Sequence, residues 1–168
     1  VKMWRNANPA IVNYWWELND AALAAIRTGY ARVRNISFRY VKGDLVITLP
    51  SNRSLVYHKA GITQGRMGDR IHYYGMDQVR KVWCKQETYG GKLAENITQA
   101  VASDLLRHAM LSLHKAGYPL VMTVHDEVVC DYGKGSIEEL TELMSRKPTW
   151  AKDLPLKADS YETFFYKK

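Results

Sequence analysis

Residues 121–131 form a strand-like stretch that is broken at its centre by charge: Val-Met-Thr-Val-His-Asp-Glu-Val-Val-Cys-Asp. β-Branched and apolar residues favour strands, and the interruption by His125, Asp126 and Glu127 predicts an antiparallel hairpin with a charged turn. Such a turn holds a carboxylate in a fixed place on a stiff support, which suits a metal-binding acid. An ordinary hairpin with a solvated acidic turn is the alternative. The lack of Gly, Asn and Pro in this turn makes that alternative weaker.

The hydrophobic pattern divides the first half of the chain into a helix and several strands. Apolar residues at helical spacing predict a helix over 11–26 that ends at Gly29. Between residues 30 and 59, apolar runs separated by turn-forming residues predict a three-stranded antiparallel meander. We expect an irregular loop at 60–75, which is rich in Gly and Arg, and a short helix at 76–87.

The second half of the chain carries the strongest helical pattern, over 92–115, and residues 117–119 (Gly-Tyr-Pro) end it. The charged hairpin follows. A capping box that starts at Ser136 then opens another helix, which we expect to end near Arg146. Residues 156–159 suit a last strand.

Together these elements predict an α+β fold, in which long helices pack with an antiparallel β-hairpin and a small β-meander is inserted near residues 30–59. The length of 168 residues suits one domain. The opening Val-Lys-Met-Trp does not resemble a start of translation, so we expect a fragment of a longer chain. Without a twenty-residue apolar stretch or a signal-like N-terminus, we expect a soluble, intracellular protein with no membrane partner. Cys84 and Cys130 lie beside apolar residues and suit a core rather than a disulfide or metal site.

The formal net charge of the chain is +7. A basic protein of this size is a candidate for a polyanionic partner. Lys and Arg outnumber acids in the first ninety residues, while residues 137–142 are acidic. The first half of the chain is therefore the better candidate for contact with a polyanion.

The helix predicted over 92–115 has two distinct faces. Its apolar face consists of Leu93, Ile97, Val101, Leu105 and Ala109. A polar stripe on another face consists of Lys92, Asn96, Gln99 and Ser103. Amide donors suit a duplex minor groove, since adenine and thymine both accept hydrogen bonds there. An ordinary solvated helix face is the alternative.

Several segments in a fixed order carry a family resemblance. They are 4–12 (Trp-Arg-Asn-Ala-Asn-Pro-Ala-Ile-Val), 89–100 (Tyr-Gly-Gly-Lys-Leu-Ala-Glu-Asn-Ile-Thr-Gln-Ala), 124–127 (Val-His-Asp-Glu) and 150–158 (Trp-Ala-Lys-Asp-Leu-Pro-Leu-Lys-Ala). Gln99-Ala-Val-Ala-Ser-Asp104 lies about twenty residues before the charged turn. This set resembles the C-terminal palm region of family A (DNA polymerase I-like) DNA polymerases, and most closely their bacteriophage branch. The resemblance covers nearly the whole chain.

The resemblance implies part of a phage or prophage nucleotidyltransferase that replicates DNA by a two-metal mechanism. By position, Asp126 would be one of the two aspartates that bind the catalytic Mg²⁺ ions, and His125 and Glu127 would flank the primer terminus and the metal site. The implied DNA contacts are Lys92, Asn96, Gln99, Ser103 and His125. Carboxylates are the ligands that a hard cation such as Mg²⁺ prefers.

The chain also departs from the family. A polymerase of this kind needs a second metal-binding aspartate, in a motif like Asp-x-Ser-x-x-Glu-x-Arg, and a fingers helix that grips the incoming nucleotide. Neither occurs in this sequence. Arg66, Arg70, Tyr74 and Gly75 repeat the spacing of the fingers helix, but glycines in this segment disfavour a helix.

We therefore expect a partial palm domain that provides one ligand of a two-metal site and does not polymerise alone. Its expected partners are primer–template DNA, the incoming nucleotide through the missing fingers, and the remainder of the polymerase. The expected location is the cytoplasm of a bacterium or a phage-infected cell.

A metal-dependent phosphohydrolase is one alternative. Its ligand set would be His72 or His108, then His125 and Asp126, then Asp131 or Asp159. In that class of enzyme the His–Asp pair lies on a helix, and residues 122–130 are too rich in valine for a helix.

A non-enzymatic nucleic-acid-binding module is the other alternative. It would use the basic first half of the chain and the meander. Its phosphate contacts would be Arg32, Arg34, Arg39 and Arg53.

Overall fold

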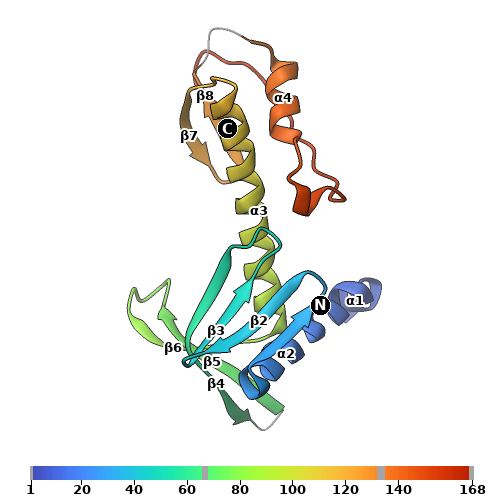
Figure 1. Ribbon diagram of the computed structural model, residues 1–168, viewed down its shortest axis with the longest axis vertical. Coiled ribbons are helices and arrows are strands. Elements are labelled where there is room, and N and C mark those ends of the chain that lie inside the picture. Colours follow the sequence, from blue (N-terminus) through green and yellow to red (C-terminus); the bar gives the residue numbers. More distant parts are fainter. Residues whose placement is uncertain (1, 66–67, 132–134, 167–168) are drawn as a thin grey trace. The chain divides into compact units, whose positions relative to one another are not determined.

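The computed structural model describes residues 2–65, 68–131 and 135–166. It combines helices with antiparallel sheets, as expected for the α+β class, and it divides into two compact units, Val1–Gln99 and Ala100–Lys168. The long helix α3 (Gly90–Lys115) contributes residues to both units (Figure 1). The expectation that the chain is one partial domain of a larger enzyme stays a prediction.

Two helices open the first unit. α1 (Lys2–Ala7) is short, and α2 (Pro9–Thr28) begins with proline, whose missing N–H has no partner at that position in any helix. Gly29 ends α2 in a left-handed conformation (φ 92°), and its N–H donates to the Ala25 carbonyl at 2.8 Å. The predicted helix and its end at Gly29 are confirmed. No helix in the described part of the chain has the length and apolar character needed to cross a membrane.

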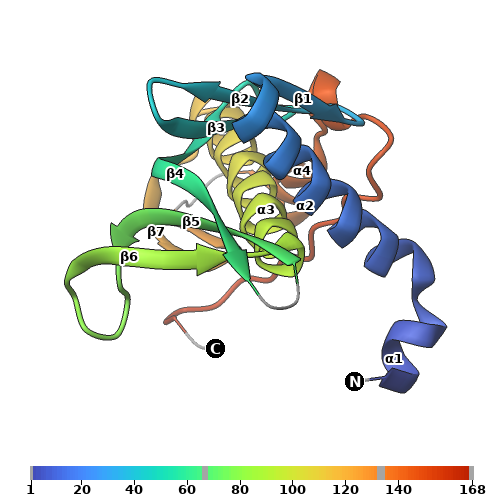
Figure 2. The ribbon, with the colours of Figure 1, turned by 90° about the horizontal axis from the view of Figure 1, so that it is seen from below.

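A six-stranded antiparallel sheet follows α2, and its strands neighbour one another in chain order. The strands are β1 (Tyr30–Val33), β2 (Ile36–Val41), β3 (Asp44–Thr48), β4 (Ser54–Gly65), β5 (Gly68–Met76) and β6 (Trp83–Thr88). Every second residue along the strands is buried, including Ile36, Phe38, Leu45 and Ile47. Since successive side chains point to opposite faces, this is the pattern of a sheet that is covered on one face. α2 packs on β1 and β2, and the sheet curves around the first turns of α3 (Figure 2).

The sheet is larger than the predicted three-stranded meander, and two predictions were wrong. Of the residues expected as a loop, 60–65 and 68–75 lie in β4 and β5, while 66–67 lie outside the described residues. Residues 76–87, expected as a helix, form the end of β5, a turn and most of β6. The glycines that suggested a loop have a packing role in the sheet. A Cβ atom on Gly61 would lie 2.8 Å from Cε1 of His72 on the neighbouring strand, so a side chain at this position would have to displace the His72 ring.

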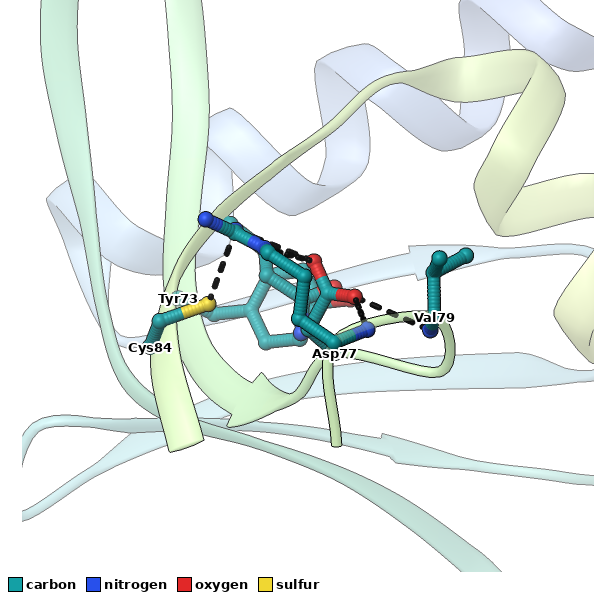
Figure 3. A network of polar contacts seen from close by, with 6 residues as sticks. Tyr73, Asp77, Val79 and Cys84 are labelled. Atoms are coloured by element: carbon teal, nitrogen blue, oxygen red, sulfur yellow. Dashed lines mark hydrogen bonds and ion pairs between the residues drawn. The ribbon is translucent and has the colours of Figure 1, made fainter. Parts of the chain in front are cut away.

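The turn between β5 and β6 is built around the carboxylate of Asp77 (Figure 3). Its Oδ1 accepts from the backbone N–H groups of Val79 at 3.0 Å and Arg80 at 2.8 Å, and its Oδ2 accepts from the Arg80 guanidinium at 3.0 Å. The Arg80 N–H, followed by the Arg80 side chain, lowers the pKa of Asp77. The Asp77 side chain thus caps a single helical turn, in which the N–H of Lys81 donates to the Asp77 carbonyl at 2.9 Å. This turn ends at Lys81, whose φ is 55°, and the chain continues into β6 instead of a longer helix.

The first turn of α3 lies against the backbone of α2. A Cβ atom on Gly90 would lie 1.9 Å from the carbonyl oxygen of Trp15 and 3.1 Å from Cβ of Asn19. The carbonyl belongs to a regular helix and cannot move aside, so the contact requires glycine.

Gly90→Ala is expected to destabilise the protein by about 1–3 kcal/mol or more, because the added methyl group forces α2 and α3 apart. Urea unfolding followed by circular dichroism measures this change. Gly91→Ala is the matched control. Its methyl group would lie 3.0 Å from the ring of exposed Tyr89 and at an ordinary contact distance of 3.9 Å from the Trp15 ring, and alanine is the better helix former by about 1 kcal/mol. Equal stability of the Gly90→Ala variant and the wild-type chain would contradict the close approach of the two helices.

In the second unit, α3 ends in a Schellman motif. Gly117 has a φ of 88°, and its N–H donates to the His114 carbonyl at 3.0 Å. The N–H of Tyr118 donates to the Leu113 carbonyl, also at 3.0 Å. Tyr118 and Leu113 are both buried in one cluster with Leu143, so the predicted end of the helix also forms the core of this unit.

The described residues of the second unit also form the hairpin, the helix α4 (Ile137–Ser145) and the 3-10 turn η1 (Thr149–Ala151). The predicted cap of α4 is confirmed, because Ser136 Oγ accepts from the N–H of Glu139 at 3.1 Å. The strand predicted at 156–159 is wrong. The N–H of Ala158 donates to Ser145 Oγ at 2.9 Å, so α4 rather than a strand partner satisfies this backbone group.

Candidate metal and nucleic-acid site

The charged turn predicted at residues 125–127 lies at the end of a two-stranded hairpin. β7 (Leu120–Val124) and β8 (Glu127–Cys130) pair antiparallel, with Val124 opposite Glu127, so the predicted hairpin is confirmed and the turn consists of His125 and Asp126. The turns that suit such hairpins require a positive φ at the first turn residue. His125 has a φ of 55°, a conformation that few residues other than glycine adopt.

The base of this hairpin is held in the core of the second unit. The cluster consists of the buried Leu113, Tyr118 and Leu143, with Leu120, Val128, Cys130, Leu140 and Met144 packed against it. The N–H of Asp131 donates to the Pro119 carbonyl at 3.2 Å and closes the base. Burial raises the pKa of the Cys130 thiol, and Cys130 and Cys84 are both free thiols. The strands hold the tip roughly 13 Å from this base, at about 3.3 Å per residue.

The two carboxylates beside the tip have different surroundings. Asp126 is exposed, and no residue that the structure describes forms a hydrogen bond or ion pair with it. Glu127 accepts a hydrogen bond from the hydroxyl of Tyr166 at 3.1 Å. Desolvation, and then this bond, raises the pKa of Tyr166. No sequence pattern pointed to Tyr166, because the contact depends on how the C-terminal segment packs.

All four residues of the predicted polar stripe lie in α3. Lys92 and Gln99 are exposed, while Asn96 and Ser103 are half-buried. The amide nitrogen of Asn96 donates to the hydroxyl of Tyr57 in β4 at 2.9 Å. Burial raises the pKa of Tyr57, against a smaller lowering by Asn96. One donor of Asn96 therefore supports the sheet, and Lys92 and Gln99 are the more accessible members of the stripe.

The phosphohydrolase alternative gains no support from the fold. His125 and Asp126 lie in a hairpin turn rather than on a helix. Among residues 2–65, 68–131 and 135–166, no three His, Cys, Asp or Glu side chains gather as a metal site would require.

Comparison with known proteins adds one close relationship. The chain is similar to a DNA polymerase. That protein, from Bacillus phage SP02, is 41% identical over 174 aligned residues, which cover 100% of this chain and 27% of the phage polymerase. The chain thus spans about a quarter of the length of this relative. No protein-family model and no solved structure matches the chain. The relationship supports the expectation of a DNA polymerase segment, while its assignment to family A and to the palm stays a prediction.

Proposed function

We propose that this chain is the C-terminal palm region of a family A DNA polymerase of the bacteriophage type. In the complete enzyme it contributes one metal-binding carboxylate and part of the primer–template surface. The observation that carries the proposal is the exposed Asp126 carboxylate, which pairs with no described residue, at the tip of an anchored hairpin. The relationship to a phage polymerase along the whole chain supports the same reading.

Asp126 fits a magnesium ligand on chemical grounds. Its carboxylate is a hard oxygen donor, it is exposed, and no described residue competes for it. Magnesium, when bound, supplies charge stabilisation at the transferred phosphoryl group. Asp126 alone cannot complete a two-metal site, so the second aspartate comes from the remainder of the polymerase.

The neighbours of Asp126 have supporting roles. His125 and Glu127 flank the primer terminus, and the bond from Tyr166 restricts the rotamer of Glu127. A carboxylate that is oriented by a hydroxyl donor presents its free oxygen in one direction. Glu127 is therefore a positioning residue beside the metal ligand.

The substrates are primer–template DNA and an incoming deoxynucleoside triphosphate. The nucleotide is bound by a fingers helix in the remainder of the enzyme, and the reaction takes place in the cytoplasm of a bacterium or phage-infected cell. The minor groove near the primer end is contacted by Lys92, Gln99 and Ser103. Asn96 lies beside them, and its hydrogen bond to the hydroxyl of Tyr57 ties this part of α3 to the sheet.

Gln99→Ala in the intact polymerase is expected to slow extension on all sequences alike, because the minor-groove acceptors are shared by the base pairs. It should also reduce the discrimination against a mismatched primer end, since a mispair displaces those acceptors. The fold should persist, because Gln99 is exposed and the apolar face of α3 is unchanged. Steady-state extension from matched and mismatched primers measures both effects.

Thr98→Ala provides the control for this experiment, since Thr98 is also exposed on α3 but lies outside the polar stripe. It should behave like the wild-type enzyme. Wild-type rates and wild-type mismatch discrimination in Gln99→Ala would show an ordinary solvated face and remove the groove contact.

A further inference from the structure

The positive charge of this chain is concentrated in the segment that forms the sheet. Residues 30–88 contain 11 Lys and Arg against 4 Asp and Glu, whereas the rest of the chain contains 13 of each. The whole net charge of +7 therefore belongs to the sheet segment. An excess of positive charge in one segment makes that segment a candidate for contact with a polyanion.

One face of the sheet is covered and the other is open. Cross-strand pairs place Tyr30 opposite Arg39, His58 opposite Tyr74, and Tyr74 opposite Lys85. These residues alternate with the buried ones, so they project from the opposite side of the sheet. We call this side the outer face; its cationic and aromatic members include Tyr30, Arg32, Arg39, His58, Arg70, His72, Tyr74, Trp83 and Lys85.

The acids on the outer face are already engaged. Asp44 accepts from the Lys59 N–H at 2.9 Å and lies 3.1 Å from His58 Nδ1, and Glu87 pairs with Arg70 at 3.2 Å. By contrast, no hydrogen bond or ion pair from a described residue occupies the charged groups of Arg39 and Lys85. Two cations on this face are thus available to an external anion.

Exposed aromatic rings lie on the same face as these cations, on the two edge strands. Tyr30 is 52% exposed and Trp83 is 57% exposed, at opposite edges of the sheet. The Trp83 ring lies 5.9 Å from the His58 ring. Stacking on such rings requires unpaired bases, whose faces a duplex hides, so this combination selects a single strand over a double strand.

We propose that the outer face of the sheet binds single-stranded DNA, with bases stacked on Tyr30 and Trp83 and phosphates at Arg39 and Lys85. The inference rests on the proposed function only in naming DNA as the nucleic acid, because the single strand that a polymerase meets is the unpaired template. The six strands span roughly 24 Å along the sheet, enough for several nucleotides of an extended strand.

Fluorescence anisotropy of a labelled oligo(dT) tests the proposal with the 168-residue chain in EDTA, so that binding does not depend on the metal role of Asp126. Trp83→Ala is expected to weaken binding about fivefold or more. The double variant Arg39→Ala/Lys85→Ala should reduce the slope of log affinity against log salt by about 1.4. Trp16→Ala and Arg5→Ala are the matched controls, because Trp16 on α2 is 63% exposed and Arg5 lies on α1.

A second measurement uses the intact polymerase on a primed template whose overhang carries 4-thiothymidine. Crosslinks to Tyr30, Tyr74 or Trp83 are expected in the digested protein. Crosslinks only outside residues 30–88, wild-type affinity in the variants, or equally tight binding of duplex would each overturn the proposal. Polyglutamate could also displace the labelled oligonucleotide as effectively as unlabelled oligo(dT) does. That result would indicate an acidic protein partner and would overturn the proposal as well. Because both assays are independent of extension, their failure is distinct from failure of the proposed catalytic role.

Discussion

Asp126→Asn in the intact polymerase is expected to slow nucleotide incorporation by at least about a hundredfold while leaving primer–template affinity nearly unchanged. The substitution keeps the size of the side chain and removes the charge that binds the metal. A catalytic metal stabilises the transition state by several kcal/mol, and each 1.4 kcal/mol corresponds to about a tenfold change in rate. Affinity persists because phosphate contacts made elsewhere dominate it. Single-turnover incorporation and equilibrium DNA binding separate the two quantities.

Asp131→Asn is the matched control for this variant. Asp131 lies at the base of the same hairpin, its side chain is exposed, and its backbone N–H holds the Pro119 carbonyl whichever side chain is present. It should incorporate nucleotide at close to the wild-type rate. Near-normal turnover in Asp126→Asn would remove Asp126 from the catalytic role.

The 168-residue chain by itself is expected to incorporate no nucleotide with either Mg²⁺ or Mn²⁺. It provides one carboxylate at the hairpin tip, and no group of three potential metal ligands forms among the residues that the structure describes. A two-metal site needs more oxygen ligands than one aspartate supplies. Primer extension with the purified chain, beside the intact polymerase as a positive control, measures this. Robust extension by the chain would mean that it contains the second aspartate and a nucleotide-binding helix.

The sequence pattern correctly predicted the elements that are determined by residues close together in the chain. The 26-residue helix α3 and its end at Gly117 follow from apolar spacing and a Schellman glycine, and the hairpin follows from two valine-rich runs around a charged break. The position of Asp126 at the tip is determined within residues 121–131. The candidate metal ligand could therefore be placed from the amino-acid pattern alone.

Two of the wrong predictions concern strands whose stability depends on neighbouring strands. β5 contains the alternating Ile71 and Tyr73, but the glycines in and before it suggested a loop. The contact between Gly61 in β4 and His72 in β5 joins two different strands, so the local pattern could not show it. The segment 76–87 suggested a helix, and one helical turn does follow Asp77. Its end at Lys81 and the pairing of β6 with β5 depend on a neighbouring strand, which the local pattern does not show.

Two contacts at the candidate site also lay beyond sequence reasoning. Asn96 bonds to Tyr57, and Glu127 bonds to Tyr166, and each pair is separated by 39 positions in the chain. No periodicity connects residues so far apart. Both contacts change how the site is understood, since one assigns a donor of Asn96 to the sheet and the other orients Glu127.

The central claim is that the Asp126 carboxylate binds a catalytic metal, and the most direct test is Mn²⁺ binding measured by electron paramagnetic resonance. The sample is the intact polymerase with a dideoxy-terminated primer, its template and the incoming nucleotide, so that no turnover occurs. We predict that Asp126→Asn weakens or abolishes Mn²⁺ binding at the protein while Asp131→Asn binds like the wild type. Identical Mn²⁺ affinity and stoichiometry in Asp126→Asn and the wild type would contradict the assignment.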